Sequence, residues 1–241
     1  MTYCVGIMLD TGLVFASDSR TNAGVDNIAS FRKMTVFERV GDRVIVLLSS
    51  GSLAGTQAVI SRLRQRNAKS DVANLWNADS LFDAAMLVSD AMREVDQRDS
   101  PHLAGSHLAF NASFILGGQI GTEAQRLFRI YAEGTFIEAS ADTAYFQTGE
   151  TKYGKPIIDR VITRSTSLAN AAKCVLVSFD STMCSNLSVG MPIDLLCYQR
   201  DSLAVRMLRR FDVGDEYFGL LGEQWTKGTR QVFDHLPDLD W

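Results

Sequence analysis

The chain has 241 residues, a mass of 26.6 kDa and 46% hydrophobic residues, which is enough to bury the core of one domain. Its formal net charge of −4 and its pI near 5.4 argue against nucleic acid as a partner, because phosphate binding needs a basic surface. The sequence shows no signal-peptide region and no apolar run near the roughly 18–20 residues that span a bilayer, so we expect a cytoplasmic protein without a membrane partner.

Two strands and a tight turn open the chain. Residues 2–9 are rich in β-branched and aromatic side chains, the turn 10–12 follows, and residues 13–17 form the second predicted strand. A hairpin returns the chain to the side of the sheet where it began. We therefore expect Asp18, which follows the second strand, to lie near Thr2.

Removal of Met1 would leave Thr2 with a hydroxyl group beside a free α-amine. Such an amine has a reference pKa of about 7.7–8.0, so near neutral pH it can accept the hydroxyl proton and activate the nucleophile. Lys33 heads a third predicted strand, residues 33–37, where its charge would favour the alkoxide and Asp18 would keep it charged. Arg32 competes for this inward position, although an arginine cannot exchange a proton.

Alternating strands and helices fill the rest of the chain. Residues 43–48 form an apolar strand, and a helix capped by Ser52 runs to about residue 66. The next helix has an apolar stripe that continues to residue 95, and Ser80 with Asp83 resembles a capping box at its start. This order of elements by itself indicates an α/β or α+β protein.

Shorter hydrophobic patterns predict the elements that follow in the second half of the chain. In chain order, they are strands at 109–116 and 126–132, helices at 153–163 and 167–183, and strands at 193–198 and 203–208. The glycine-rich segment 117–121 is predicted to be the hairpin turn between the first two of these strands, because it lacks the lysine and the helix of a phosphate loop.

The last thirty residues, 212–241, combine aromatic and acidic side chains. This mixture suits packing against a neighbouring subunit, and equally a cover for the domain's own edge. No repeat or linker divides the chain, so we expect a single domain over residues 1–241 with 212–241 as a C-terminal extension. The cysteines have no C-x-x-C spacing and are predicted to be buried free thiols: Cys4, Cys174, Cys184 and Cys197.

Four segments carry a family resemblance. They are Thr-x-x-Val-Gly from Thr2, Ala-Ser-Asp-Ser-Arg at 16–20 followed by Lys33, the run 22–28, and Leu-Ser-Ser-Gly-Ser-Leu-Ala-Gly-Thr at 48–56. Together they resemble the superfamily of proteasome β-subunits and HslV-type peptidases, most of all its bacterial Anbu, or ancestral β-subunit, branch. The resemblance is dense up to residue 55 and thinner from there to about residue 200.

This resemblance implies the α+β fold of the N-terminal-nucleophile hydrolases, a four-layer α-β-β-α sandwich, with no metal or organic cofactor. Thr2 would be the nucleophile, Asp18 the orienting acid and Lys33 the electrostatic partner. Gly51 would supply a backbone N–H for the oxyanion, where glycine lets substrate approach the chain closely. The other positions that the resemblance implies are the supporting residues Arg20, Thr148, Ser185 and Ser188, and the substrate-binding residues Thr21, Asn22, Ser49 and Leu53.

Three features depart from the family pattern. Ser185 stands where proteasomes carry an aspartate, so a charge that would fix the ammonium form of the α-amine is missing. Lys33 lies one residue closer to Asp18 than in typical proteasome subunits. Only Met1 precedes Thr2, so an aminopeptidase and not self-cleavage would have to expose the threonine.

We therefore expect a threonine-type peptidase or amide hydrolase that acts on peptide or protein substrates. The resemblance implies that it works as a homo-oligomer, in a ring or a helical assembly. An ATPase or another accessory protein is a further partner that the sequence does not identify. Two alternatives stay open: a scaffold or peptide-binding assembly with little turnover, and a small-molecule amidase or acyl transferase that uses the same threonine.

Overall fold

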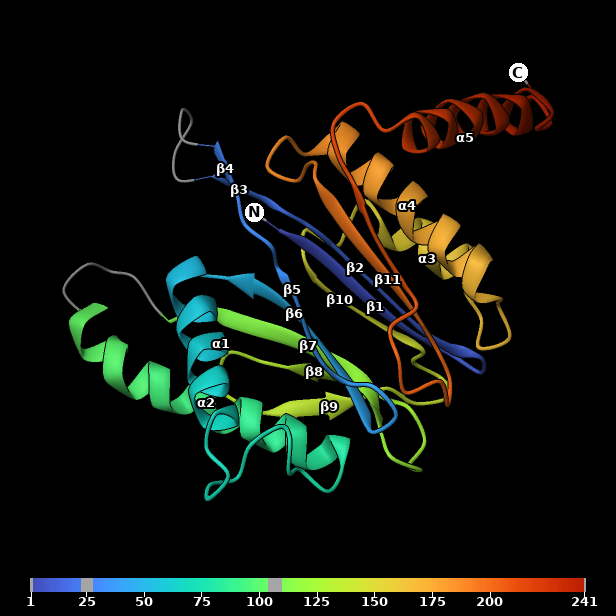
Figure 1. The fold of residues 1–241 in the computed structure, drawn as a ribbon. Coiled ribbons are helices and arrows are strands. Elements are labelled where there is room, and N and C mark those ends of the chain that lie inside the picture. Colours follow the sequence, from blue (N-terminus) through green and yellow to red (C-terminus); the bar gives the residue numbers. More distant parts are fainter. Residues whose placement is uncertain (1, 23–27, 104–109, 241) are drawn as a thin grey trace.

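The computed structural model describes residues 2–22, 28–103 and 110–240, without the side chains of Asn22, Ile28 and Leu103 (Figure 1). One antiparallel sheet of five strands contains the first residues of the chain. Its strand order is β10-β1-β2-β11-β12, with β1 Tyr3–Leu9, β2 Gly12–Asp18, β10 Tyr145–Gly149, β11 Ile193–Gln199 and β12 Met207–Phe211. The predicted hairpin of β1 and β2 therefore forms the centre of this sheet.

A second antiparallel sheet faces the first. Its order follows the chain, β5-β6-β7-β8-β9, with β5 Met34–Arg39, β6 Arg43–Gly51, β7 Ala112–Ile120, β8 Arg126–Ile130 and β9 Phe136–Glu138. A separate pair of short strands, β3 Arg20–Asn22 and β4 Ile28–Ser30, lies between β2 and β5 in the chain.

Helices cover the outer faces of both sheets, as Figure 1 shows. Those on the β5–β9 sheet are α1 Leu53–Asn67 and α2 Leu81–Leu103, and those on the other sheet are α3 Lys155–Val161 and α4 Leu168–Ser185. A last helix, α5 Glu216–Asp234, packs against α4 near the C-terminus. The molecule is thus a mixed α and β protein built on antiparallel sheets.

Three buried apolar clusters hold these elements together. One joins α1 and α2 to the β5–β9 sheet, and a second joins α3, α4 and the start of α5 to the other sheet. The third lies between the two sheets and includes Cys4, Phe15 and Ile115, which are all fully buried. Residues that alternate along β1 therefore point either to the helices or to the second sheet.

Helix capping agrees with the sequence patterns. The Ser52 hydroxyl accepts a hydrogen bond from the Gly55 N–H at the start of α1, and the Ser80 hydroxyl accepts one from the Asp83 N–H beside α2. The helix predicted to reach residue 95 continues to Leu103. In the described residues, no helix is long and apolar enough to cross a membrane.

The glycine-rich turn predicted at 117–121 is wrong except at Gly121, because residues 117–120 belong to β7. A Cβ on Gly117 would come within 2.8 Å of Leu127 and Phe15, so close packing between the sheets requires a glycine here. A Cβ on Gly118 would lie 1.8 Å from the carbonyl oxygen of Val44 on the neighbouring strand. Gly117 therefore permits close packing between the sheets and Gly118 the close approach of β6 and β7, and neither forms a turn.

Other predicted boundaries also need correction. The strand predicted at 203–208 begins only at Met207, because Asp201 and Leu203 have φ angles of 62° and 44° and form a turn. The sequence patterns predicted no strand at the residues that form β9 and β10, and no helix at the residues that form α5. Lys33 precedes β5 rather than heading it.

The four cysteines are free thiols, but the prediction that all are buried is wrong for Cys184, which is exposed in the last turn of α4. Cys197 is half-buried, while Cys4 and Cys174 are buried. Burial raises the pKa of the Cys174 and Cys197 thiols to about 11, so both are protonated and unreactive at neutral pH.

The Gly118→Ala substitution tests the close approach of β6 and β7. It should lower the free energy of unfolding by about 3 kcal/mol, because the new methyl group overlaps a backbone oxygen and one strand must move. Gly121→Ala is the matched control: its φ is also positive, at 52°, but no atom lies within 4 Å of the added Cβ. It should cost only about 1–2 kcal/mol of backbone strain. Chemical denaturation at one protein concentration measures both, and equal losses would contradict the explanation.

Candidate active site

A buried ion pair lies at one end of the space between the two sheets. Asp18 ends β2 and is fully buried, and Lys33 is 6% exposed just before β5. The Lys33 Nζ donates to Asp18 Oδ1 at 2.6 Å and to the Arg20 carbonyl oxygen at 2.7 Å. Arg32, the competing cation, is exposed, so Lys33 is the residue that occupies the inward position.

The ion pair determines the charge of Asp18. Burial raises the pKa of the Asp18 carboxyl, while the Lys33 ammonium and the Tyr3 N–H oppose that rise. The ionised carboxylate therefore depends on Lys33, because without the ammonium only desolvation and weaker hydrogen bonds would act.

Thr2 lies directly beside this pair. It is 9% exposed, and the N–H of the next residue, Tyr3, donates to Asp18 Oδ1 at 3.0 Å. The Thr2 carbonyl oxygen accepts from the Glu150 N–H at 2.6 Å. A Cβ on Gly149 would sit 1.9 Å from that oxygen, which explains why the strand opposite Thr2 carries a glycine there. One oxygen of Asp18 thus joins the Lys33 ammonium to the backbone next to Thr2.

Tyr3 anchors this backbone from the opposite face of the sheet. Its hydroxyl lies 3.1 Å from the Ser178 hydroxyl and accepts a hydrogen bond from Gln147 Nε2 at 2.6 Å. Its ring packs on Phe179 of α4, with the ring centroids 4.5 Å apart. The position of Thr2 is therefore held from both sides of β1.

Three hydroxyl groups connect the two sheets close to Thr2. Thr148, predicted as a supporting residue, belongs to β10 and lies opposite Cys4 of β1. Its Oγ1 is 2.6 Å from Ser50 Oγ and 2.9 Å from Ser113 Oγ. Ser50 and Ser113 are themselves 2.8 Å apart. Ser50 lies between the predicted site residues Ser49 and Gly51, but no separate role was predicted for either serine. Ser50 adjoins Gly51 in the quoted motif, whereas nothing in the sequence pointed to Ser113.

The loop after α4 approaches the site through Arg20. The Arg20 Nη1 donates to the Leu187 carbonyl oxygen at 2.8 Å, and a Cβ on Gly190 would lie 2.3 Å from the guanidinium carbon. Ser185 is exposed, and Ser188 is half-buried. Neither hydroxyl makes a hydrogen bond to any described residue, so the structure does not connect these two supporting residues to Thr2 through their side chains.

A buried carboxylate that sequence reasoning missed lies across from Thr2. Glu150 is 7% exposed, and its Oε2 accepts from Asn186 Nδ2 at 2.8 Å. Lys152 Nζ is 3.7 Å from the other oxygen. Because the Glu150 N–H binds the Thr2 carbonyl oxygen, this acidic residue belongs to the immediate surroundings of the N-terminus. Glu150 directly follows β10, whereas Ser185 ends α4, so the family pattern around Ser185 contains no signal for Glu150.

The predicted substrate-binding residues lie on two edges. The Ser49 N–H and hydroxyl both donate to the Lys33 carbonyl oxygen, at 2.9 and 3.3 Å. Gly51 is exposed at the end of β6 with a φ of 101°, and a Cβ there would be 2.1 Å from the Asn111 carbonyl oxygen. Leu53 begins α1. Thr21 lies in β3, opposite Ala29, while the side chain of Asn22 lies outside the described residues.

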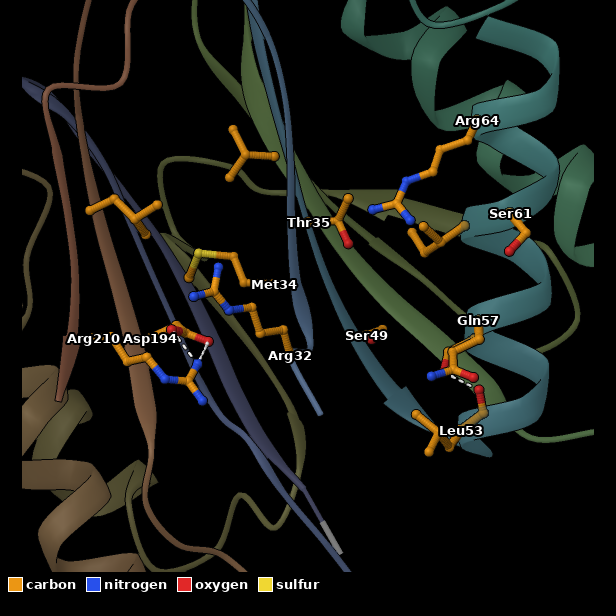
Figure 2. A pocket seen from close by; sticks show the side chains of 14 residues that line it. Arg32, Met34, Thr35, Ser49, Leu53, Gln57, Ser61, Arg64, Asp194 and Arg210 are labelled. Atoms are coloured by element: carbon orange, nitrogen blue, oxygen red, sulfur yellow. Dashed lines mark hydrogen bonds and ion pairs between the residues drawn. The ribbon is translucent and has the colours of Figure 1, made fainter. Parts of the chain in front are cut away.

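An open cavity of about 730 Å³ adjoins the ion pair (Figure 2). It extends between α1 on one side and β11 and β12 on the other, and residues of β5 line its floor. Ser49 and Leu53 belong to its lining, and Thr2 and Lys33 do not. Ser49, which binds the Lys33 backbone, therefore connects the cavity to the ion pair. Within the described ranges, no group of three or more His, Cys, Asp or Glu residues could hold a metal ion.

Comparison with solved structures found similar proteins over the whole chain. Anbu (ancestral beta-subunit) from Yersinia bercovieri is 47% identical, with a TM-score of 0.93 and 99% of each chain covered. Anbu from Hyphomicrobium sp. strain MC1 is 48% identical, with a TM-score of 0.92 over 99% of this chain and 100% of the other. The third is described as the helical assembly of the Anbu complex from Pseudomonas aeruginosa; it is 49% identical, with a TM-score of 0.94 over 99% and 98% of the two chains. No protein-family model matches the sequence, and no curated protein does.

The ion pair predicts a pH-dependent loss of stability in Lys33→Met. Without the ammonium, burial leaves the pKa of Asp18 further above its unfolded value near 3.9, so the folded state binds a proton more tightly than the unfolded state. The variant should therefore be close to the unmodified protein in stability near pH 4. It should lose about 1.4 kcal/mol for each pH unit above that, up to the folded pKa, to a total of about 3–5 kcal/mol.

The control is Asp18→Asn combined with Lys33→Met, which removes both charges. This double variant should recover much of the lost stability and should not show the added pH dependence, because no titrating carboxyl remains at the position. Denaturation midpoints at pH 4, 6 and 8, at one protein concentration, measure both variants. A pH-independent loss in Lys33→Met would show that Asp18 does not rely on Lys33.

Proposed function

Because this chain belongs to the Anbu (ancestral beta-subunit) family of proteasome-like proteins, we propose that it is an N-terminal threonine hydrolase of peptide or related amide bonds, with Thr2 as the nucleophile. The observation that carries the proposal is the Asp18 carboxylate, which accepts hydrogen bonds both from the Lys33 ammonium and from the backbone beside Thr2. A buried charge pair is costly to maintain, and here it lies next to the one residue that can combine an alcohol with a free amine.

In this proposal, an aminopeptidase removes Met1 and the Thr2 Oγ attacks the substrate carbonyl. The Oγ proton passes to the α-amine, directly or through water, as the C–O bond forms. Lys33 and the Gly51 N–H stabilise the developing negative charge, and the amine returns the proton to the leaving nitrogen as the amide bond breaks. Water then hydrolyses the acyl ester and regenerates Thr2.

Glu150 supplies the negative charge that Ser185 lacks. Its carboxylate is buried and held by Asn186, and its backbone already binds Thr2. We assign it the role of a positioning residue that holds the liberated α-amine, while the hydroxyls of Ser50, Ser113 and Thr148 support the same region from the second sheet.

The arrangement of sheets and helices supports the four-layer α-β-β-α sandwich as a single domain, with residues 212–241 as an extension for contacts between copies. Several large apolar side chains of this segment are exposed, among them Leu220, Trp225, Val232 and Phe233. A related complex is described as a helical assembly, and we extend homo-oligomer formation to this chain. An assembly would bury these side chains.

A second candidate function is a peptide-binding scaffold with little turnover. The lack of any hydrogen bond from the Ser185 and Ser188 hydroxyls to the described residues favours it, because the family's serine support is then incomplete. Intact-mass measurement of the purified protein separates the two functions. Retained Met1 would keep the Thr2 nitrogen in a peptide bond and rule out the proposed base.

Thr2→Ala should abolish amide hydrolysis and labelling by an electrophile that reacts with N-terminal threonine, because the attacking oxygen is gone. Thr2→Ser is the matched control and should keep both activities, since a serine hydroxyl and the α-amine remain. Fluorogenic peptide assays and intact mass after inhibitor treatment measure the result. Full hydrolysis by the alanine variant would end the proposal.

Glu150→Gln should move the acidic limb of the rate profile to lower pH. A carboxylate stabilises the ammonium form and raises its pKa, so its removal lowers that pKa and frees the base at lower pH. The maximal rate should also fall by about 10-fold to 100-fold, the effect of one lost charge-assisted hydrogen bond on orientation. Lys152→Gln, an exposed change beside Glu150, is the control. An unshifted profile would remove Glu150 from the mechanism.

A further inference from the structure

The cavity beside the ion pair carries an excess of positive charge. Its charged lining residues are Arg32, Arg64, Arg210 and Asp194. Arg210 is already neutralised, because its Nη1 donates to both oxygens of the buried Asp194 at 2.9 and 3.0 Å. Two positive charges therefore remain without a compensating negative charge in the lining.

Those two charges are not engaged elsewhere. Neither Arg32 nor Arg64 forms an ion pair or a side-chain hydrogen bond with any described residue. The arginines next to Arg64 on α1 differ from it, since Arg62 and Arg66 both form ion pairs with Glu94. Figure 2 shows Arg64 extending from α1 toward β5, and Arg32 on the other side of β5, near Met34. Both arginines belong to the lining of the space that a bound side chain would enter.

The rest of the lining suits a short, partly apolar side chain that ends in a polar group. Leu53, Met34 and Ile60 provide apolar surface, and Thr35, Gln57 and Ser61 provide polar groups. A carboxylate at the end of such a side chain matches the planar, five-donor geometry of a guanidinium. A basic side chain would instead meet two uncompensated positive charges.

We propose that this cavity recognises an acidic side chain of the substrate, aspartate or glutamate, adjacent to the carbonyl that Thr2 attacks. The link to the reacting centre is Ser49, which lines the cavity and donates two hydrogen bonds to the backbone of Lys33. The inference rests on the proposed function, because it takes Thr2 as the reacting group. The preference for acidic ligands, however, can be measured without any reaction.

The first experiment compares two peptide electrophiles that differ only in the side chain before the reactive group, glutamate or glutamine. The rate of mass addition to Thr2 should be at least about tenfold higher for glutamate, the effect of one charge-assisted hydrogen bond. The difference should shrink at 1 M salt, where the screening length is about 3 Å. Equal rates, or faster addition of the glutamine probe, would overturn the inference.

Two variants locate the effect. Arg64→Ala should lower the ratio of glutamate to glutamine labelling by about tenfold, and the combined change Arg32→Glu and Arg64→Glu should reverse the preference in favour of a lysine probe. Arg62→Ala is the matched control, because it removes the same charge from the same helix but from outside the cavity lining, and it should leave the ratio unchanged. The same loss in Arg62→Ala and Arg64→Ala would reduce the effect to overall charge and contradict the site.

A binding measurement keeps this inference separate from the proposed function. The Thr2→Ala protein, titrated calorimetrically with short acetylated peptide amides ending in glutamate or glutamine, should bind the glutamate peptide about tenfold more tightly. If no electrophile labels the unmodified protein but this preference appears, the catalytic proposal fails and the acidic site stands. Equal binding of the two peptides, or no binding of either, overturns the site.

Discussion

The buried ion pair of Asp18 and Lys33 is the interaction on which the rest of the site depends. Taking two charges out of water costs several kcal/mol each, so the pair persists only where its geometry is good and further hydrogen bonds assist it. Here the Tyr3 N–H and the Arg20 carbonyl oxygen supply that assistance. Because both are backbone groups beside the N-terminus and at β3, the pair determines where the first residues of the chain lie.

The surroundings of Thr2 combine contributions from both sheets and from the loop after α4. Ser49 fixes the backbone of Lys33, the hydroxyls of Ser50 and Thr148 join β6 to β10, and Glu150 binds the Thr2 backbone. Each of these contacts brings together residues at least sixteen positions apart in the chain. The same arrangement opens a cavity next to the ion pair, and two arginines of its lining, Arg32 and Arg64, form no ion pair with any described residue.

Local patterns predicted those parts of the fold in which the side chains of one element determine its structure. The β1 and β2 hairpin, the cap at Ser52 and the apolar stripe of α2 all follow from short-range rules. The strand β10 was missed because its buried residues Gln147 and Thr148 are polar and find partners only across the fold. Gly118 was predicted to lie in a turn, because the sequence alone does not distinguish a glycine that a turn requires from one that lets two strands approach closely.

For the site, the sequence by itself determined which residues can do chemistry: Thr2 behind a removable methionine, an acid and a lysine at the ends of neighbouring elements, and a glycine before a helix cap. Only the tertiary structure decided that Lys33 and not Arg32 turns inward, and that the backbone of the buried Glu150 binds Thr2 while Ser185 is exposed. The physical reason is that residue type determines what a group can donate, accept or transfer. Which groups meet is determined by the burial of apolar faces from elements far apart in the chain.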